Sequence, residues 1–138
     1  KNNGGYWELA GLLNMGITCI SGSGNNIFAG TFGFGIFVSS NNGVSWVAVN
    51  NGLTNKFIQS LTTSGGNIYA GTGGNGVFRS TNNGASWVSA GLSGKYVRSM
   101  MYDGNILYAG NDALLRKSAP VAEVYTSRQT STWLWLLT

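Results

Sequence analysis

A short motif that recurs at a nearly constant interval restricts the fold of this chain more than any other feature. The hexapeptide NNGGYW at 2–7 returns as NNGVSW at 41–46 and as NNGASW at 82–87, 39 and 41 residues apart. A second block recurs in phase with it, as NIFAGT, NIYAGT and NILYAGN, and a third as GIFVSS, GVFRS and ALLRKS. Self-similarity with a period of about 40 residues predicts a chain built from repeated structural units.

Each unit contains four short runs of strand-forming residues, separated by Gly, Asn and Ser residues that tolerate the backbone of tight turns. Composition favours turns and strands as well, because the chain is rich in Gly, Asn, Ser, Thr, Val, Ile and aromatic residues. Only 9% of its residues are charged, where about 25% is usual. Four strands in about 40 residues are typical of one blade of a β-propeller. The predicted strands are 5–9, 17–21, 26–30, 35–39, 45–49, 58–62, 67–71, 76–80, 86–90, 96–101 and 106–110, with a weaker third strand near 113–118.

The predicted fold is therefore all-β, with about three four-stranded antiparallel blades in permuted order. A fourth strand at 5–9 precedes blades at 17–49 and 58–90 and a partial blade at 96–118, and a tail without repeats follows at 119–138. Propellers close with about four to eight blades, so three blades leave two open edges. We expect either that copies associate into a ring or filament, or that the chain is part of a larger propeller. In the first case the N-terminal strand of one copy would complete the last blade of the next.

The spacing S-x-N-x-G-x-S-W resembles the Asp-box, or bacterial neuraminidase repeat, S-x-D-x-G-x-T-W, which occurs in secreted β-propellers. The resemblance implies that each motif is the hairpin between the third and fourth strands of a blade, with its Trp packed beneath. This chain has Asn where the family prefers Asp; Asn makes the same turn bonds without charge, and we expect no calcium site. The matching residues are Asn2, Gly4 and Trp7; Ser39, Asn41, Gly43, Ser45 and Trp46; and Ser80, Asn82, Gly84, Ser86 and Trp87.

Catalytic chemistry has little support in the residues. The chain has no histidine and one cysteine, Cys19, which we expect to be a core thiol because its neighbours are apolar. Four arginines and four acids do not form the groupings that a sialidase or a glycosidase requires. The G-x-G-x-x-G match at 71–76 precedes a strand and not a helix, so we interpret it as a blade turn. We therefore predict a non-catalytic protein without cofactor or metal.

The charges also restrict the partners. Eight scattered bases against four acids give a net charge of +4, a distribution that does not favour a nucleic-acid interface. Between Leu9 and Asn55 there is no charged side chain, and such a surface suits contacts with sugars or with protein. We expect an extracellular, cell-surface or periplasmic location.

The predicted function is self-association through blade edges and tail, and the alternative is a carbohydrate-binding propeller or a fragment of a larger secreted one. The tail ends in the uncharged segment TSTWLWLLT at 130–138, which is too short to span a membrane. Its composition suits addition to an open sheet edge, either of its own subunit or of a neighbour. The candidate contact residues are Phe32, Phe34, Tyr96, Trp133 and Trp135.

Overall fold

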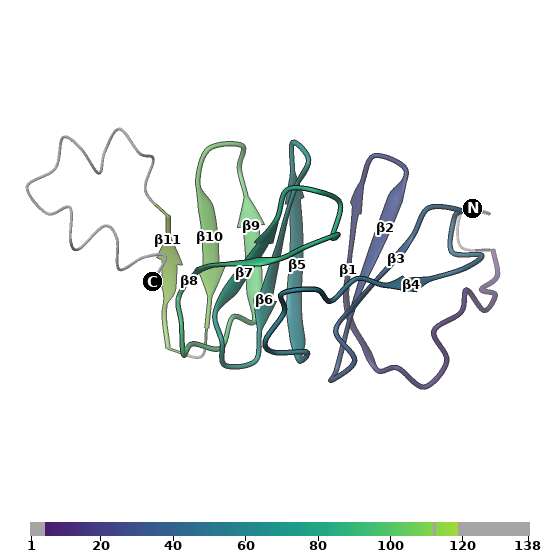
Figure 1. Ribbon diagram of the computed structural model, residues 1–138, viewed down its shortest axis with the longest axis horizontal. Helices are drawn as coiled ribbons and strands as arrows, with labels where there is room; N and C mark the ends of the chain where they lie inside the picture. The colour runs from purple at the N-terminus through teal and green to yellow at the C-terminus, as the bar shows by residue number, and fades with distance from the viewer. Residues whose placement is uncertain (1–4, 112, 119–138) are drawn as a thin grey trace, which may run out of the picture.

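The computed structural model describes residues 5–111 and 113–118, and all regular elements of these residues are β-strands. They form three antiparallel sheets that stand side by side (Figure 1). The predicted all-β fold of partial propeller blades is thus confirmed. The first sheet contains β1 (Ile17–Ser23), β2 (Asn26–Thr31), β3 (Ile36–Ser39) and β4 (Val47–Ala48); the second β5 (Ile58–Ser64), β6 (Asn67–Thr72), β7 (Val77–Ser80) and β8 (Val88–Gly91); the third β9 (Ser99–Tyr102), β10 (Leu107–Gly110) and β11 (Leu115–Lys117).

Each sheet is a simple meander in which strands consecutive in sequence are neighbours in space. The first strand of the second sheet, β5, contacts the first strands of both neighbouring sheets, β1 and β9. The first sheet therefore lies at one end of the row and the third at the other, with β11 as its outermost strand (Figure 1). This order places the beginning and the end of the described chain at opposite ends of the molecule.

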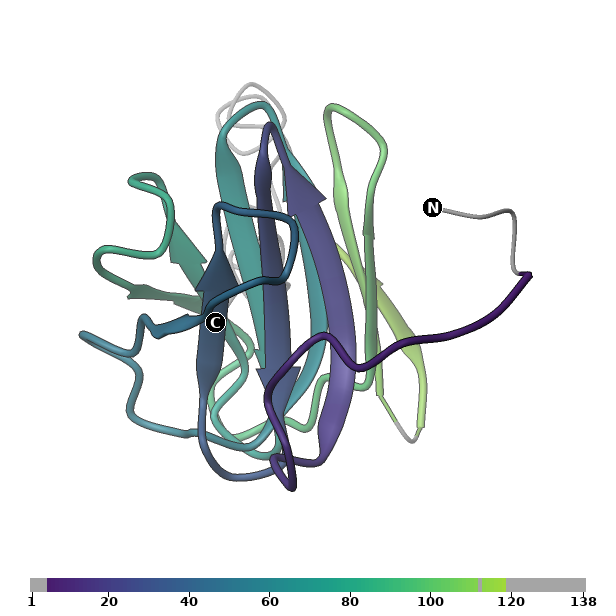
Figure 2. The same ribbon diagram turned by 90° about the vertical axis from the view of Figure 1, so that its right-hand side faces the viewer.

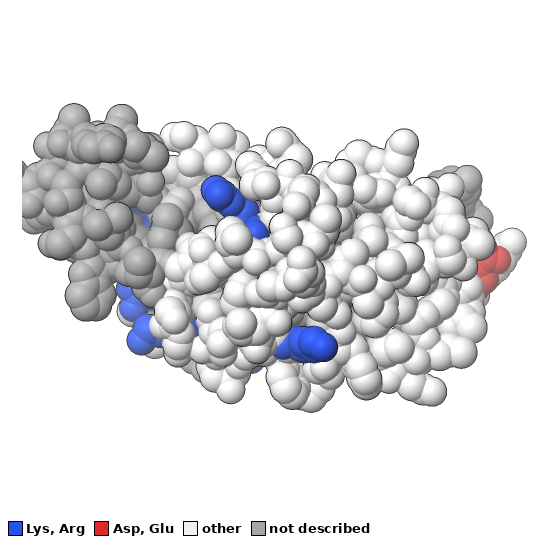
Figure 3. Space-filling model, viewed as in Figure 1, with Lys and Arg blue, Asp and Glu red and all other residues white. Residues whose placement is uncertain are grey.

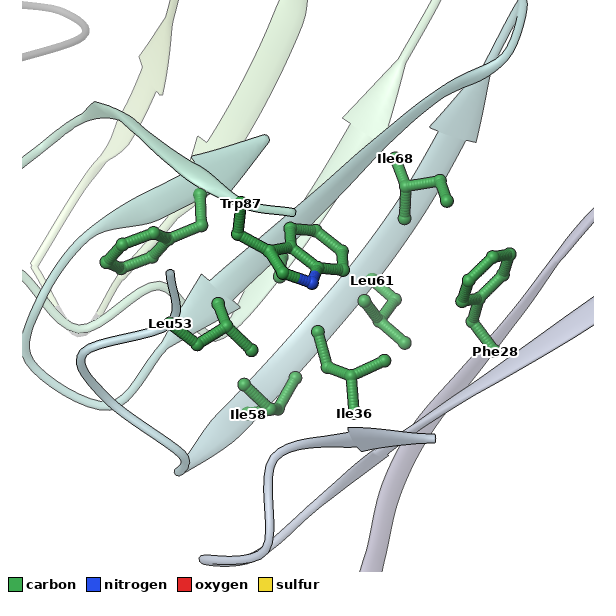
Figure 4. Packing of buried hydrophobic residues seen from close by; sticks show 9 residues of the cluster. Phe28, Ile36, Leu53, Ile58, Leu61, Ile68 and Trp87 are labelled. Carbon is green, nitrogen blue, oxygen red and sulfur yellow. The ribbon is translucent and has the colours of Figure 1, made fainter. Parts of the chain in front are cut away.

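Two apolar layers fill the spaces between the sheets. On β6, Ile68 faces the first sheet and Tyr69 faces the third, because successive side chains of a strand point to opposite sides. Both faces of the second sheet are therefore covered. The first layer, between the first and second sheets, consists of Phe28, Ile36, Leu53, Ile58, Leu61, Ile68, Ala70, Phe78 and Trp87 (Figure 4). The second layer, between the second and third sheets, consists of Tyr69, Val77, Leu92, Val97, Leu107 and Ala109.

The glycines of the repeated NIFAGT and NIYAGT blocks allow adjacent sheets to approach closely. A Cβ atom on Gly30 would lie 2.5 Å from the Cys19 Sγ and 2.6 Å from the Ile58 Cγ2. At the equivalent Gly71 it would lie 2.7 Å from the Val97 Cγ1. Any larger residue would force the next sheet away, so the recurrence of glycine here follows from packing and not from turn formation.

A network of side-chain hydrogen bonds holds the hairpin between β7 and β8. The Asn82 Oδ1 accepts hydrogen bonds from the Ser80 hydroxyl and the Ser86 N–H, both at 2.9 Å, and its Nδ2 donates to the Ser86 Oγ at 2.8 Å. The Ser80 Oγ in turn accepts the Gly84 N–H at 2.9 Å. Ser39, Asn41, Gly43 and Ser45 repeat these bonds between β3 and β4. The amide performs the turn-forming role that the sequence predicts for it.

The predicted strand at 5–9 is absent, and this part of the sequence-based prediction is wrong for the single chain. The segment has no regular structure and leads away from the sheets (Figure 2). A fourth strand needs a third strand beside it, and β3 and β7 already pair with β4 and β8. The outer edge of β11 lies at the other end of the row, out of reach of this segment within one molecule.

Replacing Asn82 with Ala removes three side-chain hydrogen bonds, and we expect it to lower the free energy of unfolding by about 1–2 kcal/mol. Asn82→Asp keeps both acceptor bonds, and the Ser86 hydroxyl can donate to the carboxylate. We therefore expect this variant to stay within about 0.5 kcal/mol of the wild type. Urea denaturation measures both differences, and equal losses would show that these bonds do not hold the turn.

Candidate functional site

Trp87 lies on the face of the second sheet that the first sheet covers. Its indole lies in the first layer, 3% exposed, and its Nε1–H donates to the Val49 carbonyl of the preceding sheet at 2.8 Å. Ile58 and Leu61 of β5 lie in the same layer and are 0% and 9% exposed. The second sheet thus buries its first strand and its motif tryptophan against the sheet before it (Figure 4).

The equivalent positions of the first sheet are open. Ile17 pairs with Thr31 as Ile58 pairs with Thr72, and Ile20 pairs with Ala29 as Leu61 pairs with Ala70. Yet Ile17 is 47% and Ile20 is 69% exposed, because no described sheet packs over these two side chains. We call the side of the first sheet that carries Ile17 and Ile20 the N-terminal face.

A short segment before β1 covers only part of this face. The Trp46 Nε1–H donates to the Ala10 carbonyl at 2.7 Å, as the Trp87 Nε1–H donates to the Val49 carbonyl. Residues 10–12 therefore occupy the position, relative to the first sheet, that the residues around Val49 occupy relative to the second. Trp46 is half-buried as a result, whereas the exposed β1 residues beside it have no such cover.

Trp7 departs from the sequence-based expectation that each motif tryptophan packs beneath a hairpin. It is 92% exposed, and the segment that carries it forms no strand. Asn2 and Gly4 of the same motif lie outside the described residues. Trp7 is thus open to solvent in the described chain, whereas Trp46 is half-buried and Trp87 is buried.

The third sheet is open on its outer side. Leu115 pairs with Gly110 as Val77 pairs with Gly71, but Leu115 is 71% exposed and Val77 is 0% exposed. Met101 of β9 is exposed on the same side, while its neighbour Met100 packs against the second layer. We call the side that carries Met101 and Leu115 the C-terminal face.

Charge is distributed unevenly along the row of sheets. Six bases of the described chain lie in or beside the second and third sheets, and none lies in the first. Glu8 lies in the segment before the first sheet, and Asp103 lies in the turn between β9 and β10. Figure 3 shows this distribution, with basic groups over the second and third sheets and an acidic group at the N-terminal end. The two open ends therefore differ in charge.

An exposed row of aromatic side chains runs from the turn between β2 and β3 to the residues just before β5 and β9. Phe32 and Phe57 form an edge-to-face pair with ring centroids 4.9 Å apart. Gly73 follows, close to the Phe57 Cβ and to the Tyr96 ring. The Arg98 guanidinium lies over Tyr96, 5.8 Å from the ring centroid. Three of these side chains, those of Phe32, Phe57 and Tyr96, are about half exposed, so the row is accessible to a ligand.

Two of the predicted contact residues, Phe32 and Tyr96, belong to this aromatic row. Phe34 lies exposed in the same turn as Phe32 but has no ring partner among the described residues. Trp133 and Trp135 lie outside the described residues. Phe57 is not among the predicted contact residues, although it precedes a first strand just as Tyr96 does.

Among the titratable groups of the described chain, Cys19 and Asp103 have pKa values shifted by their surroundings. Residues 5–111 and 113–118 contain no group of three potential metal ligands. Cys19 is half-buried against the first layer, and this burial raises the pKa of its thiol. The Asp103 carboxylate accepts the N–H groups of Ile106 and Asn105, which holds its pKa below the ordinary value. Cys19 therefore packs as a core thiol, and Asp103 fixes a turn.

The G-x-G-x-x-G match at 71–76 lies in the turn between β6 and β7, and no helix follows it. The Thr72 hydroxyl donates to the Gly76 carbonyl at 2.8 Å and accepts the Asn75 N–H at 3.1 Å. Thr31 holds the corresponding turn of the first sheet in the same way. The match is thus a hairpin turn, as predicted, and it lacks the helix N-terminus that a dinucleotide site requires.

Comparison with known proteins places the fold among β-propellers. No family model and no curated protein matches the chain. Its fold resembles an ancestral GH74 enzyme, with 21% identity and a TM-score of 0.63 over 70% of this chain and 14% of that one. It also resembles the extracellular domain of a hybrid two-component system from B. thetaiotaomicron, with 21% identity and a TM-score of 0.63 over 77% of this chain and 16% of that one.

A third similar structure is the GH74 xyloglucanase from Xanthomonas campestris, with 20% identity and a TM-score of 0.54 over 72% of this chain and 20% of that one. Identities this low show the fold alone. The chain spans only 14% to 20% of the length of these three structures. In the part of the chain that the structure describes, no helix is long and apolar enough to cross a membrane.

The contrast between covered and open positions can be measured directly. Leu61→Ala removes a side chain from the first layer, and we expect it to cost about 2–4 kcal/mol of unfolding free energy. Ile20→Ala changes the equivalent position on the N-terminal face, and in dilute solution we expect a loss below about 0.5 kcal/mol. Denaturant titrations at low protein concentration test the pair. A large loss for Ile20→Ala at every concentration would show that its own chain covers this face.

Proposed function

We propose that this chain is a non-catalytic β-propeller protein that acts through contacts, and that its two open faces join copies head to tail into a ring or a filament. The observation that supports this most directly is the equivalence of positions in the three sheets. Ile58 and Leu61 are buried by the sheet before them, whereas Ile17 and Ile20 occupy the same positions without a cover. A further sheet of the same kind would bury them in the same way.

Head-to-tail contact follows from the order of the faces. In both interfaces within the chain, one face of a sheet packs against the sheet before it, and the other face packs against the sheet after it. The N-terminal face is of the first kind, and the C-terminal face is of the second. They are therefore complementary to each other, which makes the contact heterologous, so that it either closes a ring or extends as a filament.

The Asp-box assignment and the extracellular location belong to the same proposal. The bonds of Asn41 and Asn82 are those that the Asp-box resemblance implies. One structure of similar fold is an extracellular domain, and the scarcity of charged side chains suits a protein that works by surface contact. The dispersed positions of Glu8, Asp103 and Cys19 favour a role without catalysis.

Light scattering over a dilution series tests the association. We expect the wild type to show a mass above that of one chain, falling on dilution. Ile20→Lys should return it to a single chain, because a charge would be buried in the contact. Val88→Lys is the matched control, since Val88 is similarly exposed but lies on the outer strand of the covered second sheet.

The control should assemble like the wild type, and negative-stain images should show rings or filaments for both. A wild-type chain that stays a single folded copy at every concentration contradicts the proposal. So does an Ile20→Lys variant that assembles as well as Val88→Lys.

A second candidate function is carbohydrate binding, and the aromatic row favours it. Sugar rings stack on exposed aromatic faces, and the Phe32 and Phe57 rings are held together at the surface. The Gln59 amide lies beside Gly73 in the middle of the row and offers hydrogen bonds to hydroxyl groups. One structure of similar fold is a xyloglucanase, which supports the choice of neutral polysaccharides as the first probes.

Binding to a glycan array measures this second function. We expect Phe57→Ala to reduce the signal of any bound glycan by at least about tenfold, since removal of a central aromatic contact has an effect of that order. Phe34→Ala serves as the control, because Phe34 is as exposed but has no ring partner in the described chain. An array that stays blank with assembled wild-type protein argues against carbohydrate binding.

A further inference from the structure

We propose that residues 5–9 of one copy add to β11 of the next copy as the fourth strand of its third sheet. In this arrangement Glu8 lies opposite Lys117, and Trp7 enters the second layer of the receiving copy. The proposal rests on the head-to-tail association above and names the segment and the register that form it. The partner is a second copy of this chain.

The register follows from the two complete sheets. The residue after each motif tryptophan pairs with one residue of the third strand: Val47 pairs with Val38, and Val88 pairs with Arg79. Lys117 holds the same place in β11, because it pairs with Tyr108 as Arg79 pairs with Tyr69. The residue after Trp7 is Glu8. Transferring the observed pairing therefore sets Glu8 opposite Lys117.

Charge distinguishes this pair from the two pairs already formed. The pair of Val47 and Val38 has no charge, and the pair of Val88 and Arg79 has one basic side chain. Glu8 with Lys117 would join an acid to a base, and opposite charges directly across two strands are favourable. Both side chains are exposed in the single chain. Pairing of two N-terminal segments or of two β11 edges would instead bring like charges together, so the charges favour the head-to-tail order.

The carbonyl groups that accept hydrogen bonds from the motif tryptophans also place Trp7. The Trp46 Nε1–H bonds to the Ala10 carbonyl, and Ala10 is followed by Gly11 and Leu12, both with positive φ. Ala90 in the second sheet is likewise followed by a glycine and a leucine with positive φ, Gly91 and Leu92.

Ala90 and Leu92 pack in or against the second layer, so the Ala90 carbonyl is the equivalent acceptor for a tryptophan of the third sheet. The first layer contains Trp87, while the described second layer contains no tryptophan. Trp7 from a neighbouring copy would take this place.

Cysteine cross-linking between different chains tests the register. One preparation carries Glu8→Cys and another Lys117→Cys, both with Cys19→Ser so that the native thiol does not react. Mixed and oxidised, they should give a disulfide-linked product that contains one chain of each kind. A mixture of Glu8→Cys with Lys56→Cys is the control, because Lys56 is also an exposed base but lies before β5. We expect at least about ten times less product from the control, since its positions do not pair.

Charge reversal gives a second measurement without new thiols. Glu8→Lys and Lys117→Glu should each weaken association roughly two- to fivefold, and combining both substitutions in one chain should restore it. Trp7→Ala should weaken it at least about tenfold, as expected for the loss of a central tryptophan. All three residues are exposed in the single chain, so the substitutions leave its own packing intact.

The outcomes separate this inference from the proposed association. Oligomers that form without the Glu8–Lys117 cross-link and without rescue by the double reversal overturn the strand exchange but leave association standing. A chain that is a single copy at every concentration overturns both. If the cross-link forms only after residues 119–138 are deleted, then the tail of the same chain occupies β11, and the strand exchange is overturned for the full chain.

Discussion

The structure depends on the packing of each sheet against the face of the next. A four-stranded sheet of this length cannot bury its own side chains, and its stability comes from its neighbours. The two apolar layers supply this burial, and Gly30 and Gly71 allow adjacent sheets to approach closely. The same rule exposes Ile20 at one end and Leu115 at the other, because a row of sheets that does not close always leaves two faces uncovered.

Uncharged hydrogen bonds hold the hairpins that position these faces. In Asn41 and Asn82 both functional atoms of the amide bond within the turn, so that neither depends on pH or on a cation. The motif tryptophan then extends from the turn to the carbonyl of the preceding sheet. A hairpin is thus tied at once to its own sheet and to the one before it. Trp7 differs from the other two motif tryptophans, because it is 92% exposed in the single chain.

Repeat spacing alone was enough to predict the class of fold and the approximate position of the strands. It succeeded because strand and turn residues alternate regularly in units such as 58–90, and because the turn chemistry of Asn82 is local. It failed at 5–9, where local preference for a strand is present but no partner strand is in reach. The contact of Phe57 with Phe32 of another sheet was evident only in the structure, although Phe57 stands before β5 as Tyr96 stands before β9.

The sequence by itself determined the all-β class, the period of about 40 residues and the hairpins, since these depend on residues close together in the chain. Only the tertiary structure decided which equivalent residues are buried. Ile17 and Ile58 have the same identity and the same place in their sheets, yet one is open and the other covered. The difference arises from the presence of a neighbouring sheet about 40 residues away in sequence, and no local pattern encodes whether such a neighbour is there.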